Sequence, residues 1–265
     1  MKSAALGFFY YGLVSCQVSV LDVGLCKSRE GALQLTHTLN ANTVECDTTN
    51  WRHGFMTCNE MDYSDIKDRI ADSLESLKKL HDNHLVTGEA FTHLLVYQLI
   101  PYWYGTPWAF EGYSATPNTG SIACGYFVST TLLHMGLHVN RYKLAQQLPV
   151  HEALSIAGED RVLTVEILPD TNRAEALVQA CPENGVYFIG FDQSHVGYLY
   201  RSGACSFIIH SDYLSTGVVA IESALNSPVL NAYSRYYIAP ISTNEWLMNC
   251  WLTGKEISII ETPDD

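Results

Sequence analysis

The sequence predicts an α+β protein in which a helix beginning at Cys124 packs against an antiparallel sheet. From Cys124 onward, apolar or small residues recur at positions i, i+3, i+4, i+7, i+8 and i+11, which is the spacing of the core-facing side of a helix. Residues 186–213 are rich in β-branched and aromatic residues and are interrupted by the segments DQS and RSGA. This pattern predicts three antiparallel strands.

The composition is that of a folded protein with an acidic surface. The chain has 265 residues, of which 47% are hydrophobic and 16% charged, so we expect a compact globular protein. Its formal net charge of −13 disfavours nucleic-acid backbones and anionic membrane surfaces as partners. No apolar run reaches the roughly 18 to 20 residues of a spanning helix, so we expect membrane attachment only through a lipid.

Residues 1–16 have the pattern of an export signal, because Lys2 precedes an apolar stretch that runs to Val14. The segment Leu13-Val14-Ser15-Cys16 resembles the bacterial lipobox, in which the cysteine is lipidated and becomes the mature N-terminus. The resemblance implies an exported periplasmic or outer-membrane lipoprotein of a bacterium that is anchored at Cys16. A secreted protein is the alternative.

Eight cysteines occur in the chain. If Cys16 is lipidated and Cys124 stays free for chemistry, the remaining six permit up to three disulfides in an oxidising compartment. No C-x-x-C pair is present, so the sequence does not support a zinc ribbon or a thioredoxin-type motif.

Two helices are expected before Cys124. Apolar residues at helical spacing predict a surface helix over 63–80, and the following apolar segment predicts a second helix that Pro101 stops. Residues 26–60 show no clear periodicity. After the Cys124 helix we expect a short helix, a strand and a helix with Thr171 as its N-cap, over residues 140–148, 161–168 and 171–181.

The strand-rich segment carries two histidines. If residues 201–204 form a four-residue hairpin loop, His195 lies directly opposite His210. Directly opposed residues point to the same face with Cβ atoms roughly 5 Å apart. A second histidine at that place can hold the first in one tautomer, as an orienting group does beside other catalytic bases. A register shift of one residue would send the rings to opposite faces.

The place of Cys124 at a helix start has a chemical consequence. Unpaired N–H groups and the positive end of the helix dipole meet there, so we expect a stabilised thiolate and a lowered pKa. The alternative is that Cys124 is a small buried apolar residue, as free cysteines often are.

These residues resemble the NlpC-type peptidoglycan endopeptidases, which have a papain-like fold. In that family a G-x-P-aromatic loop leads to a cysteine at a helix start, and two strands follow, one beginning His-Val-Gly and one ending in a polar residue, often histidine. The matching positions are Gly105, Pro107, Trp108, Cys124, His195-Val196-Gly197 and His210. The resemblance covers about residues 100–213. The chain departs from the family at Ala123, Gly125 and Tyr126, where Asp, Ser and Gly are usual.

The resemblance implies a cysteine peptidase or amidase of papain-like fold. Cys124 would be the nucleophile, His195 its general base and acid, and His210 the orienter of His195. The Cys124 N–H would bind the oxyanion, helped by Tyr113 or, as second candidate, Tyr104.

On this reading residues 17–98 form an N-terminal extension with helices, and residues 99–265 the catalytic domain. The expected substrate is a peptide, most simply the stem peptide of peptidoglycan, and the reaction requires no cofactor. Trp108 is a substrate-contact candidate in the loop.

Three other functions remain open. A transglutaminase-like acyl transferase or an amidase effector has the same order of residues, and there Asp212 would orient the histidine in place of His210. A zinc site made by Cys124, His195 and His210 is a second possibility. The third is a papain-like lipoprotein that has lost activity and serves as a binding scaffold.

Overall fold

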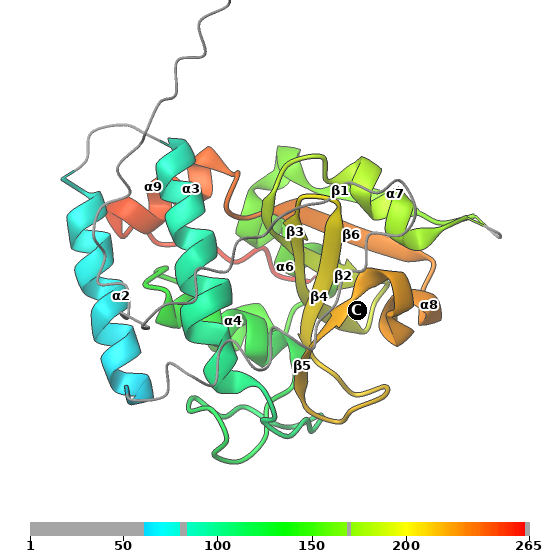
Figure 1. Cartoon of the computed structure of the whole chain (residues 1–265), viewed down its shortest axis with the longest axis horizontal. Coiled ribbons are helices and arrows are strands. Elements are labelled where there is room, and N and C mark those ends of the chain that lie inside the picture. The colour runs from blue at the N-terminus through cyan, green and yellow to red at the C-terminus, as the bar shows by residue number, and fades with distance from the viewer. Residues whose placement is uncertain (1–60, 80–83, 169–170, 263–265) are drawn as a thin grey trace, which may run out of the picture. The chain divides into compact units, whose positions relative to one another are not determined.

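The computed structural model describes residues 61–79, 84–168 and 171–262. The expected export signal, the lipidation candidate Cys16 and most of the expected extension lie outside these residues. Within them the chain combines helices with one antiparallel sheet, so the expected α+β class is confirmed (Figure 1). None of the helices in these ranges is both long and apolar enough to cross a membrane.

The sheet has six strands in the order β1-β6-β2-β3-β4-β5, and every neighbouring pair is antiparallel. The expected strand over 161–168 and the three expected strands over 186–213 are present as β1 to β4, while β5 and β6 complete the sheet. The strands are β1 Leu163–Glu166, β2 Gly185–Phe191, β3 His195–Ser202, β4 Cys205–Ser211, β5 Val219–Ser223 and β6 Arg235–Pro240.

The expected register of the β3–β4 hairpin is wrong by two positions. Ser202 pairs with Cys205, so the turn is Gly203-Ala204 rather than a four-residue loop, and Gly203 takes a positive φ of 59°. Continued along the strands, this register puts His210 opposite Gly197, not opposite His195. Because the pairing moves by an even number of residues, both histidines still point to the same face of the sheet.

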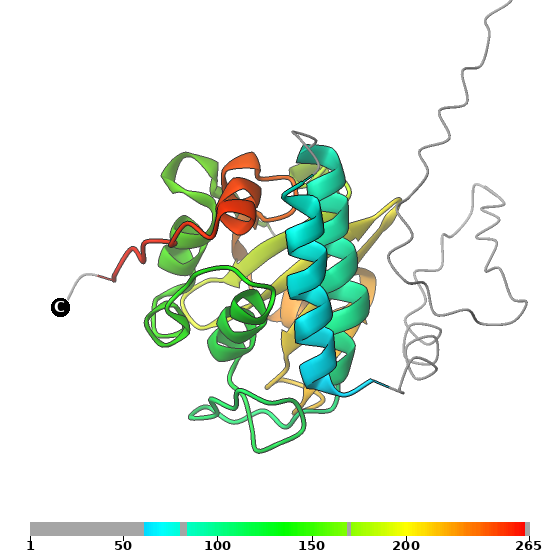
Figure 2. The same ribbon diagram turned by 90° about the vertical axis from the view of Figure 1, so that its left-hand side faces the viewer.

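The helices that precede the sheet in the chain belong to the apolar cluster on one face of the sheet. Helix α2 (Tyr63–Leu77) buries Ile66 and Ile70, as the spacing predicts. Helix α3 (His84–Thr92) continues as the π-helical segment η2 (His93–Leu99) and the 3-10 helix η3 (Ile100–Trp103). Helical structure therefore ends two residues after Pro101 and not at the proline itself. A proline is tolerated in the first turn of η3 because an N–H at that position would make no hydrogen bond within the helix. Figure 2 shows α2 and α3 side by side.

The Cys124 helix is present as α4 (Cys124–His134). The expected helix over 171–181 begins one residue later than predicted, because Asn172 and not Thr171 caps it through the N–H of Glu175. The remaining helical elements are α5 Arg141–Ala145, α6 Pro149–Ala157, η4 Glu159–Arg161, α7 Arg173–Ala180, η5 Ala224–Asn226, α8 Pro228–Ala232 and α9 Glu245–Thr253.

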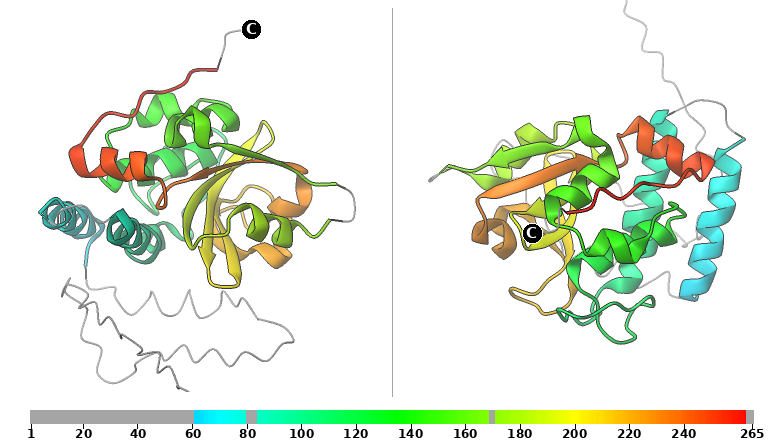
Figure 3. Two further views of the ribbon diagram at one scale, coloured as in Figure 1. Left: turned by 90° about the horizontal axis from the view of Figure 1, so that it is seen from above. Right: turned by 180° about the vertical axis from the view of Figure 1, so that it is seen from behind.

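Two apolar clusters hold the sheet between helices. On one face Val196 and Tyr198 of β3 pack with α4, and the same cluster includes residues of α2, α3, α6 and α9. On the other face Leu199 and Ile208 pack with Leu177 of α7 and Leu230 of α8. Figure 3 shows α7 and α8 on the side of the sheet away from α4. Helices from the expected extension and from the expected catalytic domain therefore share one core.

The state of the cysteines narrows the disulfide prediction. Cys205 is disulfide-bonded, whereas Cys124, Cys181 and Cys250 are free. Two of the six cysteines considered for disulfides are thus unpaired, which leaves four and at most two bonds, so the three-bond arrangement is wrong.

Candidate functional site

Cys124 lies at the first residue of α4, where a tight loop delivers the chain. The N–H of Ile122 donates to Pro107 O at 2.9 Å, and the N–H of Ala123 donates to Gly112 O at 2.8 Å. Ala123 is the N-cap in an extended conformation and has no side chain that could occupy the helix end. The thiol is therefore the side chain nearest to the unpaired N–H groups of the first turn.

The thiol of Cys124 is half-buried and neutral. Backbone N–H groups of Val196, Gly125 and Cys124 itself lower its pKa, but burial has the larger effect and raises the pKa to about 11. The expectation of a lowered pKa is therefore wrong for the free protein. The helix start contributes in the expected direction and is outweighed by the loss of water around the sulfur.

The two histidines are joined as predicted, although by a different register. His195 Nε2 lies 2.8 Å from His210 Nδ1, and both side chains are buried. Gly197 makes this diagonal contact possible, because a Cβ at that position would lie 2.9 Å from the Cβ of His210 and 2.9 Å from Ile209 O. His210 thus leans across the bare backbone of Gly197 to reach the ring of His195.

His195 is a neutral imidazole, and one of its ring nitrogens makes no hydrogen bond within the described ranges. Its ring lies 5.4 Å from that of Phe191 and 5.2 Å from that of Tyr213. Burial, followed by the neighbouring His210, holds the pKa of His195 well below its ordinary value of 6.5. Its Nδ1 is buried and has no hydrogen-bond partner within the described ranges. The next residue in the chain, Val196, donates its backbone N–H to the thiol of Cys124, so the start of β3 contacts the sulfur.

Asp212 organises a loop and does not orient His195. Its carboxylate accepts hydrogen bonds from the N–H groups of Leu214, Ser215 and Thr216 and from the hydroxyls of Ser215 and Thr216, at 2.6 to 3.1 Å. Burial alone would raise the pKa of Asp212, but these bonds hold it well below its usual range. His210 is thus the residue bonded to His195.

The loop tied by Asp212 covers His195 with Tyr213, a residue that the sequence did not single out. The Tyr213 hydroxyl lies 2.6 Å from that of Tyr233, which lies 2.8 Å from the Ser194 hydroxyl. Trp108 lies against the same tyrosine, with ring centroids 5.7 Å apart. The candidate Trp108 is thereby brought to the His195 side of the site.

Of the two tyrosine candidates, Tyr113 lies beside the helix start, because it pairs with Ile122, two residues before Cys124. Tyr113 is 62% exposed, and its ring lies 6.2 Å from that of Tyr126 on α4. Tyr104 is half-buried and packs against the core cluster that includes α4.

A buried acid behind Cys124 was also missed. Glu152 on α6 is 2% exposed, and burial raises its pKa well above the ordinary value of 4.5. A Cβ added at Gly125 would lie 3.0 Å from Oε1 of Glu152 and 2.7 Å from the carbonyl oxygen of Ala145 on α5. Glycine at 125 therefore lets α5 and α6 approach the first turn of α4. No spacing or motif in the sequence signals this burial.

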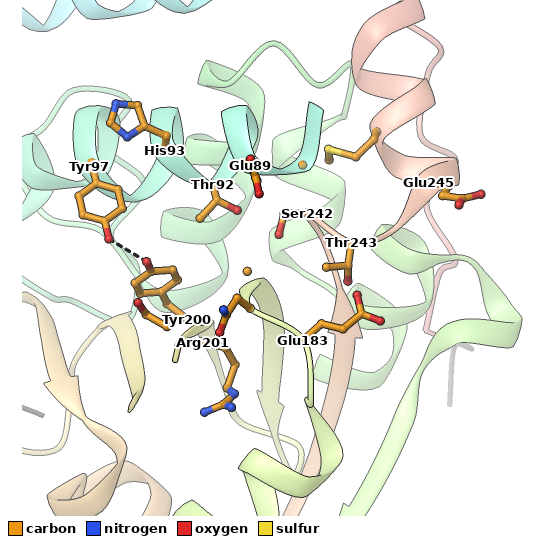
Figure 4. Close-up of a pocket in the computed structure, with 15 residues that line it drawn as sticks. Glu89, Thr92, His93, Tyr97, Glu183, Tyr200, Arg201, Ser242, Thr243 and Glu245 are labelled. Carbon is orange, nitrogen blue, oxygen red and sulfur yellow. Dashed lines mark hydrogen bonds between the residues drawn. The ribbon is translucent and has the colours of Figure 1, made fainter. Parts of the chain in front are cut away.

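A cavity of about 600 Å³ lies away from these groups, at the end of β3 opposite to His195 (Figure 4). Carboxylates of Glu89, Glu183 and Glu245 surround it. The guanidinium of Arg201 points away from the cavity and is occupied by the carbonyls of Cys181, Cys205 and Gly203 and the hydroxyl of Ser206. Among the described residues that line it, no serine hydroxyl is hydrogen-bonded to a histidine.

Within the described ranges, no three His, Cys, Asp or Glu side chains are grouped so as to hold a metal ion. Comparisons of the chain with protein-family models, with curated proteins and with solved structures find no match. Its function is therefore inferred from the geometry of its own residues.

Proposed function

We propose that this protein is a cysteine hydrolase that cleaves an amide or peptide bond through Cys124, His195 and His210. One observation carries the proposal. His195 keeps a buried Nδ1 with no hydrogen-bond partner within the described ranges, its Nε2 is held by His210 at 2.8 Å, and the N–H of the adjacent Val196 contacts the Cys124 thiol. A base that takes a proton from a thiol requires one free ring nitrogen and one oriented ring nitrogen.

The proposed reaction begins from a neutral thiol and a neutral imidazole. As Cys124 Sγ bonds to the substrate carbonyl carbon, the thiol proton moves to His195 Nδ1. The amine leaves with that proton, and a thioester to Cys124 remains. Water then attacks the thioester and loses a proton to His195 Nδ1, which returns it to the sulfur as the carboxylic acid leaves. Backbone N–H groups of Gly125 and Val196, which face the sulfur, are candidate donors to the oxyanion.

The proposed fold relationship is papain-like, on the basis of a nucleophile at a helix start packed against an antiparallel sheet that carries the histidines. The proposed substrate is a peptide, most simply the stem peptide of bacterial peptidoglycan. An exported location, with a lipid at Cys16 or as a secreted protein, belongs to the same proposal. The acyl-transferase alternative loses support, because the carboxylate of Asp212 is occupied by its own loop.

The test uses the full chain with a mixture of soluble muropeptides. We expect new peptide fragments by mass spectrometry, none with Cys124→Ala, and a rate lower by about 10²–10⁴-fold with His195→Ala, the usual contribution of a positioned base. His138→Ala, at an exposed histidine, is the control and should retain the rate.

A second measurement requires no substrate. Iodoacetamide should alkylate Cys124 of the parent at pH 7.5 faster than Cys124 of His195→Ala. Equal alkylation in both proteins, together with no muropeptide cleavage, would overturn the proposal and favour the inactive scaffold. Transfer of the acyl group to an added amine instead of water would favour the transferase.

A further inference from the structure

The contacts of the histidine pair do not end at His210. The second ring nitrogen of His210, Nε2, is buried and has no hydrogen-bond partner within the described ranges. The atom that faces it is Oε1 of Glu222, at 3.5 Å. At this distance the contact is electrostatic rather than a well-formed hydrogen bond.

The sheet puts Glu222 on the same face as the two histidines. His210 of β4 pairs with Ala220 of β5, and Glu222 lies two residues further along the same strand. Side chains two residues apart on a strand share a face, so Glu222 and His210 are diagonal neighbours. The side chain of Glu222 is 18% exposed and that of His210 is 1% exposed, so the contact is largely shielded from water.

A helix cap holds the carboxylate in place. The hydroxyl of Ser227 donates a hydrogen bond to the same Oε1 of Glu222. Ser227 is also the N-cap of α8, and its oxygen accepts the N–H of Leu230 at 3.1 Å. The hydroxyl proton is therefore directed at Glu222, and the carboxylate is fixed by the start of a helix rather than left free to rotate.

We propose that Glu222 is a positioning residue that fixes the tautomers of both histidines. The proposal rests on the proposed function, because it deepens the role of the same site. A carboxylate only accepts, so it selects the tautomer of His210 that has its proton on Nε2. His210 Nδ1 is then an acceptor, and the nitrogen that faces it, His195 Nε2, must carry a proton. The lone pair of His195 is left on Nδ1, the nitrogen required to take the thiol proton.

The opposite assignment would disable the base. With a proton on His210 Nδ1, His195 Nε2 would have to accept, and His195 Nδ1 would carry a proton of its own. The carboxylate also lies on the side of the histidine pair where negative charge stabilises the imidazolium formed when His195 takes up the thiol proton. Glu222 thus acts through His210 and does not itself touch the reacting atoms.

The test reads the tautomers directly. Nitrogen NMR of ¹⁵N-labelled histidine rings in the full chain at pH 7.5 should show His195 and His210 protonated on Nε2. In Glu222→Leu we expect Nδ1-protonated forms of both rings and iodoacetamide alkylation of Cys124 slowed by about tenfold, a part of the roughly 10²–10⁴ that a positioned base supplies. Glu222→Gln, whose amide oxygen can still accept, should retain more Nε2-protonated ring than Glu222→Leu. Glu166→Leu, on the other edge strand of the sheet, is the control and should change neither readout.

The outcomes separate this proposal from the proposed function. If Glu222→Leu folds, as judged by circular dichroism, and both rings retain their tautomers, the role of Glu222 is overturned even in an active enzyme. Where Glu222→Leu fails to fold, Glu222→Met, which also removes the acceptor oxygens, is measured in its place. If the parent protein neither cleaves muropeptides nor shows His195-dependent alkylation, the proposed function fails, whereas the ring-nitrogen spectra still decide what Glu222 does.

Discussion

Replacing Glu152 by glutamine should stabilise the protein in a pH-dependent way. Glu152 lies on α6 behind the first turn of α4, it is 2% exposed, and its Oε2 has no hydrogen-bond partner within the described ranges. Because burial raises its pKa well above 4.5, the folded protein keeps this side chain protonated at a pH where the unfolded chain ionises it. Folding then takes up a proton, and that uptake becomes costlier as the pH rises.

The magnitude follows from proton linkage. Stability from this group is fully present below pH 4.5 and is lost as pH rises from there through the pKa of the folded state. The loss is about 1.4 kcal/mol for each pH unit in that window, or at most about 3 kcal/mol by pH 7. Glutamine has nearly the same shape and does not ionise, so Glu152→Gln should match the parent near pH 4 and exceed its free energy of unfolding at pH 7.

Urea unfolding at pH 4, 5.5 and 7 measures the effect. Glu175→Gln is the matched control, because Glu175 also occupies the first turn of a helix but is exposed, and we expect it to leave the pH dependence of stability unchanged. If Glu152→Gln and the parent have parallel stability curves across this range, Glu152 ionises in the folded state much as in the unfolded chain, and the assignment of a neutral buried acid is refuted.

Three further predictions concern the same site and its surroundings. Gly197→Ala should push His210 away from His195, destabilise the fold by about 1–3 kcal/mol, and slow alkylation of the nucleophile; an unchanged alkylation rate would contradict the diagonal contact. Asp212→Asn should cost about 1–3 kcal/mol of stability and speed hydrogen exchange of the Thr216 amide, and an equally protected amide would count against its role in the loop. His134, whose pKa burial lowers to about 4, should make the protein lose stability as the pH falls from 6.5 toward 4, and His134→Gln should flatten that part of the curve.

Local patterns were sufficient for the start of α4 and for the two-histidine hairpin. A helix repeats every 3.6 residues, so the stripe from Cys124 fixes both the helix and the side that it buries. The hairpin register was not fixed in this way, because the segment Arg201-Ser202-Gly203-Ala204 allows more than one turn. Gly203 takes the positive φ of a two-residue turn. The histidines remain on one face because the difference is an even number of residues.

Contacts between distant segments were beyond these patterns. Glu222 meets His210 only because β5 returns beside β4, and Glu152 reaches Gly125 only because α6 packs behind α4. Neither pairing has a periodicity or a spacing that could reveal it. Tyr213 was passed over because its importance comes from the loop that Asp212 ties, and hydrogen bonds of a carboxylate to its own loop leave little trace in the sequence.

The direction of the Cys124 pKa bears on how the proposed reaction must proceed. A helix start alone favours a thiolate, but here burial outweighs the N–H groups and the resting sulfur holds its proton. A neutral thiol requires a base that is not already protonated. The strongly lowered pKa of His195 keeps its imidazole in this unprotonated form. Deprotonation is then coupled to attack on the carbonyl rather than completed beforehand. The base form of His195 should therefore persist below pH 6.5, where an ordinary histidine would already be protonated and unable to accept the proton.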